Sequence, residues 1–281
     1  DLLGKSLEAP VYQLLGGAVR ERVKVYAHVG GDTTEELCTR SKALATQGFS
    51  VLKTSFAPPV AYLENQAFVE SCTERFATLR NVVGPEVDLA IDFHGRFSPA
   101  MSKRMIRALE PYYPFFIEEP CLPGNTDALV ELRNSTTVPL ATGERLFTKW
   151  GFRDLIQRQA VAILQPDLCH AGGIGEVKKI AAMAEACDLA VAPHNPLGPI
   201  SLAACLQLDA CTHNAFLQEQ VTLGEGYLKE PFIMEEGYIK VPQKPGLGIE
   251  LDVARIKELE YDGRWQTPRV FDEKDSSVAE W

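Results

Sequence analysis

Three acidic residues end three short apolar segments of the sequence at equal intervals. The segments VDLAIDFHG, FFIEEP and PLATGE contain Asp92, Glu118 and Glu144, with spacings of 118 − 92 = 26 and 144 − 118 = 26 residues. A set of carboxylates with no cysteine among them suits a hard cation such as Mg²⁺. The chemistry we expect from this set is the binding of one Mg²⁺, and the simpler alternative is ordinary surface charge.

A strand, a loop and a helix fit into each of these intervals, which is typical of parallel β/α architecture. In β/α barrels the active site lies at the C-terminal ends of the strands, where these acids fall. The apolar runs are short and nearly continuous, as expected for strands buried on both faces. We predict eight strands, at 23–29, 49–54, 87–93, 115–118, 139–142, 162–165, 189–192 and 216–219. A small hairpin (FIMEEGYIKVP) and a closing tail follow them.

The last three predicted strands also end in residues that can do chemistry: Asp167, His194 and Glu219. An aspartate beside a histidine from the next strand fixes the imidazole tautomer and raises its basicity. His194 alone could equally be a core or loop histidine. With Asp167 on the neighbouring strand, we expect the two residues to form a general-base dyad.

A second histidine stands two residues after the first acid. Residues at i and i+2 share a face of a strand, so His94 is expected beside Asp92 and close to a metal-bound substrate. The alternatives are that His94 is a further ligand or a structural histidine. His28, His170 and His213 receive no catalytic role.

The second strand ends near Lys53, which can act as a base, hold a carboxylate or extend to solvent. A second basic residue two positions on would favour a two-base site, but position 55 is serine. In FFIEEP the adjacent acids point in opposite directions, so only one can bind the metal directly, and equal spacing favours Glu118. Glu119 is then expected in a supporting role, as a partner of Arg145 or of Lys53.

The composition and charge of the chain argue against some partners and indicate its cellular surroundings. The chain has 281 residues and a formal net charge of −10, which argues against binding to nucleic acid or to an anionic membrane surface. Its seven cysteines are scattered and form no CxxC pair, which indicates reduced thiols and a cytoplasmic location. No apolar run reaches 18 residues, and no signal peptide is visible.

Several stretches together resemble the enolase superfamily, in its mandelate racemase-like branch, and within it the galactonate dehydratases. The matching stretches are APVYQLLGG, DFHGR, FFIEEP, PLATGERLF, ILQPDLCHAGGI, APHNPLGPISLAACLQLD, LQEQ, KPGLGIELD and SVAEW. The resemblance implies an α/β fold of the modified TIM-barrel, (β/α)₇β type, preceded in the family by a capping domain. We therefore expect residues 1–20 to be a linker helix left from a missing N-terminal cap, 21–220 the barrel, and 221–281 the hairpin and tail.

The resemblance also implies roles for individual residues. Asp92, Glu118 and Glu144 correspond to the Mg²⁺ ligands of the family, and Asp167 with His194 corresponds to its base dyad. Glu219 matches a residue that contacts the substrate or intermediate. From the chemistry, Lys53 is expected to help Mg²⁺ offset the negative charge that forms during the reaction. His94 matches the histidine that protonates the departing hydroxyl. Supporting residues around these are expected at Glu119, Arg145 and Gln165.

The implied reaction is the Mg²⁺-dependent dehydration of a sugar acid, with D-galactonate the first candidate, to a 2-keto-3-deoxy acid through an ene-diolate. The partners expected are this small molecule and further copies of the chain in a homo-oligomer. Three alternatives remain open: a dehydratase for another aldonate such as gluconate, a racemase or epimerase, and an idle truncated barrel with a binding role. Ser55 argues against the racemase, because the racemases carry Lys-x-Lys at this position.

Overall fold

The computed structural model describes residues 1–56, 60–261, 263–264, 270–271 and 275–279. The chain divides into two compact units. Unit 1 contains Asp1–Ala27, Gly143–Gln157 and Ile163–Tyr261, and unit 2 contains His28–Thr142, Arg158–Ala162 and the described residues after Tyr261. Each unit carries part of the predicted site.

Unit 2 is built on four parallel strands that run in chain order. They are β2 (Val51–Ser55), β3 (Asp88–Asp92), β4 (Ile117–Glu118) and β5 (Leu140–Thr142). Asp92 pairs in register with Ser55 on one side and with Glu118 on the other. The two acids therefore stand together at the C-terminal edge of these strands, as the sequence predicts.

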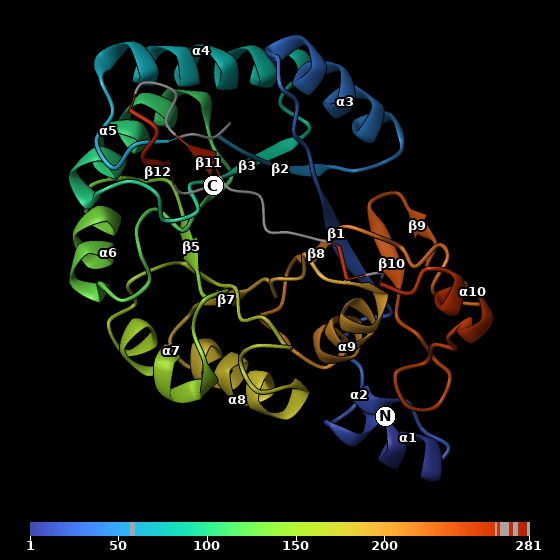
Figure 1. The fold of residues 1–281 in the computed structure, drawn as a ribbon. Coiled ribbons are helices and arrows are strands. Elements are labelled where there is room, and N and C mark those ends of the chain that lie inside the picture. The colour runs from blue at the N-terminus through green and yellow to red at the C-terminus, as the bar shows by residue number, and fades with distance from the viewer. Residues whose placement is uncertain (57–59, 262, 265–269, 272–274, 280–281) are drawn as a thin grey trace. The chain divides into compact units, whose positions relative to one another are not determined.

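The helices of unit 2 lie outside these strands (Figure 1). They are α3 (Thr34–Thr46), α4 (Gln66–Val83), α5 (Pro99–Leu109), η1 (Glu110–Tyr112) and α6 (Thr126–Arg133). Four of them begin at a residue whose side chain accepts a hydrogen bond from the first turn: Thr33, Asn65, Ser98 and Asn125. Such caps satisfy N–H groups that the helix leaves without a partner, so polar residues after each strand fix where each helix starts.

Unit 1 continues the alternation of strand and helix. Its strands are β1 (Arg22–His28, whose last residue falls in unit 2), β6 (Ile163–Leu164), β7 (Ala190–Val191), β8 (Gln218–Gln220), β9 (Met234–Glu235) and β10 (Tyr238–Lys240). β6 pairs with β7 and β1 with β8, both in parallel, and a parallel bridge joins Asp167 to His194 just beyond β6 and β7. Its helices are α1 (Leu2–Ser6), α2 (Val11–Leu14), α7 (Thr148–Gln157), α8 (Ile174–Glu185), α9 (Pro199–Ala210) and α10 (Val253–Glu258).

The elements agree with the sequence in order and type, and differ mainly at their ends. Eight strands fall at the predicted places; β1 has the predicted length, and the other seven are shorter. The predicted hairpin is confirmed as antiparallel β9 and β10, and β10 pairs with the start of β1. The sequence did not predict α10 or the antiparallel pair β11 (Val270–Phe271) and β12 (Val278–Ala279). Residues 57–59 and the last two residues of SVAEW lie outside the described residues.

An aromatic cluster supports the end of β3. Phe93 packs on Phe56 and edge-on against Phe97, with ring centroids 5.0 and 5.4 Å apart. All three rings are buried. Since Phe93 lies between Asp92 and His94, this packing fixes the turn that carries both site residues.

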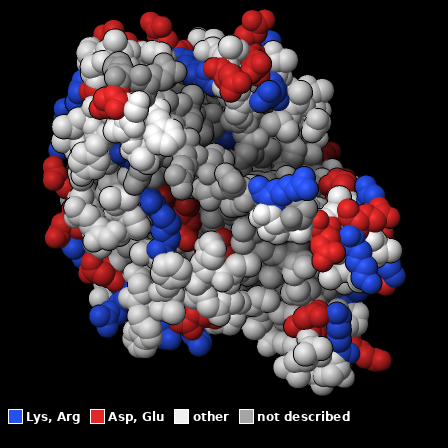
Figure 2. Space-filling view, in the orientation of Figure 1, with Lys and Arg blue, Asp and Glu red and all other residues white. Residues whose placement is uncertain are grey.

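Acidic and basic side chains are interspersed over the β9, β10 and α10 part of unit 1 (Figure 2). Several of them form exposed pairs there, among them Lys240 with Glu235, Lys244 with Glu230 and Arg255 with Glu258. Exposed pairs of this kind contribute little stability, so this surface is chiefly a solvated one. Among the described residues, no helix combines the length and the apolar character needed to cross a membrane.

Candidate active site

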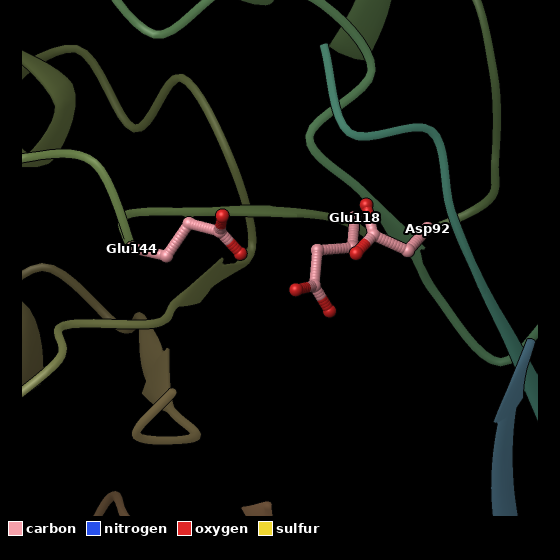
Figure 3. A group of neighbouring side chains, drawn as sticks. All are labelled: Asp92, Glu118 and Glu144. Carbon is pink, nitrogen blue, oxygen red and sulfur yellow. The ribbon is translucent and has the colours of Figure 1, made fainter. Parts of the chain in front are cut away.

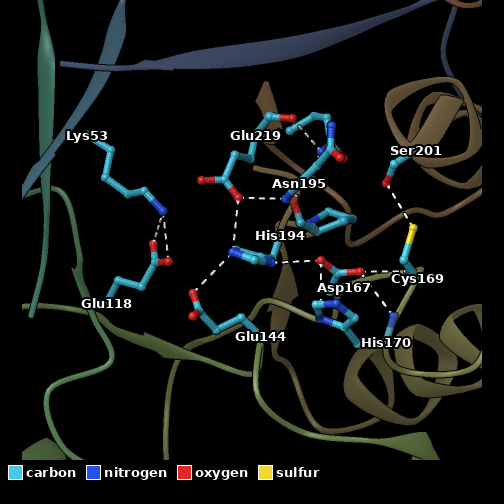
Figure 4. A network of polar contacts seen from close by, with 12 residues as sticks. Lys53, Glu118, Glu144, Asp167, Cys169, His170, His194, Asn195, Ser201 and Glu219 are labelled. Atoms are coloured by element: carbon cyan, nitrogen blue, oxygen red, sulfur yellow. Dashed lines mark hydrogen bonds and ion pairs between the residues drawn. The ribbon is translucent and has the colours of Figure 1, made fainter. Parts of the chain in front are cut away.

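In unit 2, a buried lysine binds one of the predicted metal ligands. Nζ of Lys53 donates to both carboxylate oxygens of Glu118, at 2.7 and 2.6 Å, and the two side chains are 1% and 0% exposed (Figure 4). Away from water such a pair is held strongly only when its geometry is good, as here. Of the roles predicted for Lys53, the structure places it on a carboxylate, and that carboxylate belongs to Glu118.

Asp92 and Glu118 lie next to each other at the ends of β3 and β4 (Figure 3). One oxygen of Asp92 and one of Glu118 lie within 4.8 Å of each other, and both residues are buried. Two carboxylates this close repel each other unless a cation lies with them. Lys53 supplies one positive charge to this group.

His94 lies beside Asp92, but for a reason different from the predicted one. β3 ends at Asp92, and His94 has a left-handed backbone with φ of 51°, so the two residues do not share a strand face. Instead Oδ1 of Asp92 accepts a hydrogen bond of 2.7 Å from the backbone N–H of His94, which closes an Asx turn. This turn brings Nε2 of His94 to 3.1 Å from Oδ2 of Asp92.

The surroundings of His94 disfavour its protonated form. Burial, followed by the positive charges of Arg96 and Lys53, lowers the pKa of His94 to about 3, and Glu118 only partly opposes this. At neutral pH the ring is therefore neutral in this arrangement. Negative charge added beside the ring would raise this pKa.

In unit 1, Asp167 and His194 form the predicted dyad. Nδ1 of His194 lies 2.9 Å from Oδ2 of Asp167, which is fully buried (Figure 4). Oδ1 of Asp167 accepts from the backbone N–H groups of Cys169 and His170, at 2.7 and 3.1 Å. Burial alone would raise the pKa of Asp167, but the hydrogen bond and charge of His194 and the Cys169 N–H outweigh it and hold the pKa below its usual value.

The other nitrogen of His194 faces two more carboxylates. Nε2 lies 3.3 Å from Oε2 of Glu144 and 3.9 Å from Oε2 of Glu219 (Figure 4). Glu219 is itself held by the backbone N–H of Asn195, at 2.6 Å. With Nδ1–H directed at Asp167, Nε2 is the atom that can take a proton from a substrate.

Gly143 brings the chain from β5 into the turn that carries Glu144. Its φ of 144° is rare for other residues, and an added Cβ would lie 2.9 Å from the Phe152 ring and 3.0 Å from the backbone nitrogen of Gln165. Only glycine fits here. Gln165, predicted as a supporting residue, thus bounds this turn through its backbone.

The predicted supporting residues Glu119 and Arg145 also occupy the turns at strand ends. Glu119 is buried and has a left-handed φ of 41°, directly after Glu118. Its carbonyl accepts from Gly95 N–H at 2.8 Å, which ties the turn after β4 to the turn that carries His94. Left-handed backbone at non-glycine residues costs energy and is concentrated at functional sites. Arg145 is half-buried, directly after Glu144.

Two residues of the site were given no role from the sequence. Arg96 is buried, donates to the carbonyl of Phe56 and lowers the pKa of His94, and it is the arginine of the DFHGR stretch. Asn195 directly follows His194 and holds Glu219 through its backbone. The arginine two residues after His94 in DFHGR is a sequence feature that could have pointed to Arg96. The role of Asn195 depends on its backbone N–H, which residue type does not indicate.

The chain matches a described family over most of its length. The family "Enolase C-terminal domain-like" matches residues 36–255. A D-galactonate dehydratase of Variovorax paradoxus is 43% identical over 292 residues, which cover 100% of this chain and 76% of that protein.

Solved structures of mandelate racemase/muconate lactonizing enzyme-like proteins are also similar to this chain. A mandelate racemase/muconate lactonizing enzyme-like protein from Rubrobacter xylanophilus has a TM-score of 0.89 at 34% identity, over 94% of this chain and 75% of that one. A mandelate racemase/muconate lactonizing enzyme from Jannaschia has a TM-score of 0.88 at 32% identity, over 94% and 72%. The α/β fold is thus of the modified TIM-barrel type, as predicted.

Proposed function

The chain belongs to the enolase superfamily and is a hydro-lyase, and we propose that it dehydrates D-galactonate with Mg²⁺ as its cofactor. The product is a 2-keto-3-deoxy acid. The observation that carries this proposal is the dyad of Asp167 and His194, with Nδ1 of the ring 2.9 Å from the carboxylate. The similarity to a D-galactonate dehydratase supports the choice of sugar acid.

Asp92, Glu118 and Glu144 are the residues that would hold the Mg²⁺. Asp92 and Glu118 end neighbouring strands, and Glu144 follows two residues after β5, which pairs with β4. The donors are all carboxylates, which fits the preference of Mg²⁺ for oxygen. When bound, the ion would stabilise negative charge that develops on the substrate carboxylate.

His194 is the base in this proposal. Removing the proton at C2 of a sugar acid is difficult because that proton is weakly acidic and the ene-diolate formed carries two negative charges. Asp167 orients the ring and stabilises the imidazolium that forms. In this proposal Lys53 offers a fixed positive charge, and Glu219 contacts the substrate.

His94 is the acid that protonates the hydroxyl leaving from C3. Its ring is neutral in the substrate-free chain, because burial and nearby cations lower its pKa to about 3. A dianionic ene-diolate beside it would raise that pKa and favour the imidazolium. His94, whose side chain is 22% exposed, then takes a proton from solvent and gives it to the C3 hydroxyl, which leaves as water.

The proposal is tested by incubating the chain with D-galactonate and measuring 2-keto-3-deoxy acid, with Mg²⁺ and with EDTA. We expect product with Mg²⁺ only. Gluconate and an arabinonate-type acid in the same assay test the choice of sugar. Absence of product from every acid in the presence of Mg²⁺ would contradict the proposal, and a product that keeps all its hydroxyl groups would indicate an epimerase.

The remaining features of the protein are proposals of the same kind. The partners we propose are the sugar acid and further copies of the chain in a homo-oligomer. We also propose a cytoplasmic location, because all seven cysteines are free thiols.

A further inference from the structure

Unit 2 contains a cavity behind β2 that the proposed reaction does not use. Its volume is about 190 Å³, and it lies between the end of β2 and the helices α3 and α4. Its walls are mainly apolar, formed by Leu37, Phe56, Phe68, Phe76, Leu79 and Ile91. Four of these, Leu37, Phe76, Leu79 and Ile91, are at most 3% exposed. The cavity opens near Ser55 and Ser71, which are exposed.

The size and lining of this cavity suit one small ring. An apolar protein cavity of roughly 150 Å³ lined by Leu, Ile and Phe stays dry and binds benzene. Here the volume is slightly larger and the lining is of the same type. A molecule with a six-membered ring and one substituent therefore fits.

One buried polar group would orient a ligand in the cavity. Thr54 lines it and is 6% exposed, and among the described residues its Oγ1 has no hydrogen-bond partner. Burying a hydroxyl without a partner is unfavourable, so a ligand atom that bonds to it gains that energy. A hydroxyl on the ring of the ligand would supply such an atom.

The other polar groups of the lining favour a neutral ligand. Burial, together with Glu64, raises the pKa of Cys72 to about 12, so its thiol is uncharged. The guanidinium of Arg75 is already directed at the carbonyl of Gly31. Of the described residues that line the cavity, none is acidic.

The cavity is separate from the site at the strand ends. Successive residues of a strand point to opposite faces, so Thr54 faces away from Lys53, its neighbour in β2. Lys53 bonds to Glu118, whereas Thr54 lies in the layer between strand and helices. A ligand in this cavity would contact the face of β2 that is opposite to the Lys53 side chain.

We propose that this cavity is a binding site for a small neutral aromatic alcohol of the size of phenol. The ring fills the space between Phe56, Phe68 and Phe76, and the ligand hydroxyl bonds to Oγ1 of Thr54. The site is independent of the sugar-acid reaction, so its test does not require activity.

The test is a titration of the full chain with phenol and, separately, with toluene, followed by ligand-observed NMR. Toluene has nearly the same shape and no hydroxyl. Thr54→Val keeps the volume of the cavity and removes its hydroxyl. We expect Thr54→Val to lower the ratio of phenol affinity to toluene affinity about fivefold, the effect of one neutral hydrogen bond.

A variant that fills the cavity locates the binding. Cys72→Phe places a ring in the space and should abolish binding of both molecules, and Ser71→Trp at the exposed mouth is a second such variant if Cys72→Phe does not fold. An unchanged ratio in Thr54→Val would overturn the role of the hydroxyl. Failure of both probes to bind at millimolar concentration, or binding that survives the filled variants, would overturn the site itself.

Discussion

The two aspartates beside the histidines of the candidate site are held by the same kind of turn, but the two histidines have opposite electrostatic surroundings. In unit 2, Asp92 accepts from the N–H two residues later and lies beside the ring of His94. In unit 1, Asp167 accepts from the N–H of Cys169, again two residues later, and lies beside the ring of His194. The turn positions the carboxylate in both cases, so it does not decide the chemistry.

The difference comes from what else faces each ring. His94 is buried near Lys53 and Arg96, and these cations help to keep it neutral. Nε2 of His194 faces the carboxylates of Glu144 and Glu219, which suit an imidazolium. This contrast teaches that an aspartate–histidine contact alone does not identify a base: the neighbouring charges do. It supports the proposal that His194 removes the proton and that His94 carries out the later protonation step.

The largest effect should come from removing a carboxylate of the proposed metal group. We expect Glu118→Gln to lower dehydration by about 10³-fold or more, because several kcal/mol of charge stabilisation at the substrate would be lost. Product formation from D-galactonate measures this. Glu131→Gln, at an exposed residue paired with Lys103, is the matched control and should retain activity. Equal activity in Glu118→Gln and the wild type would contradict the proposed role of Glu118 as a metal ligand.

Loss of the base should have an effect nearly as large. We expect His194→Asn to lower dehydration by roughly 10²- to 10⁴-fold, the usual contribution of a positioned general base. Exchange of the C2 proton with solvent should be lost with it, and His213→Asn is the control. If C2 exchange survived in His194→Asn, this histidine could not be the sole base.

A stability measurement tests the buried pair of unit 2. Lys53→Met leaves Glu118 buried without its lysine, which should cost about 3–5 kcal/mol of unfolding free energy. Lys53→Met combined with Glu118→Met removes both charges and should recover much of that loss. Urea unfolding of the single and double variants measures the difference. A double variant as unstable as the single one would mean that packing, and not charge, dominates.

The smallest effect concerns a buried carboxyl that lacks the support given to Asp167. Asp209 is buried in α9, and neither carboxyl oxygen has a hydrogen-bond partner in the described part of the chain. Burial raises its pKa well above the usual value, with Arg20 opposing the shift. Below the unfolded pKa of about 4 the group is protonated in both states. As the pH rises the unfolded state ionises first, so stability falls.

Asp209→Asn does not titrate and should therefore be more stable than the wild type at pH 7, with the advantage shrinking toward pH 4. Thermal unfolding at several pH values measures this, and Asp167→Asn is the comparison, because there the pKa is lowered and the sign should reverse. An advantage of Asp209→Asn that does not depend on pH would refute this explanation.

Much of this arrangement could be predicted from the sequence, because the period of strands and helices places residues at strand ends. The acids at Asp92 and Glu118 and the dyad of Asp167 and His194 follow from that period alone. What failed was the geometry of the turns. His94 reaches Asp92 through an Asx turn with left-handed backbone, and not along a strand face, because β3 has already ended.

Roles that depend on backbone groups or on distant charges could not be predicted. Asn195 holds Glu219 with its N–H, which any residue except proline could provide. The low pKa of His94 depends on burial and on Lys53, a residue of another strand. α10 was missed because no alternation of strand and helix continues into the tail. Such features appear only when segments far apart in the sequence are brought together.

The division of labour between the two histidines is tested most directly by His94→Asn in D₂O. Deuterium at C2 of recovered D-galactonate and formation of 2-keto-3-deoxy acid are measured in the same sample with Mg²⁺. The assignment predicts that deuterium continues to enter C2 while the product disappears, since His194 still removes the proton. Loss of deuterium exchange together with dehydration would contradict it.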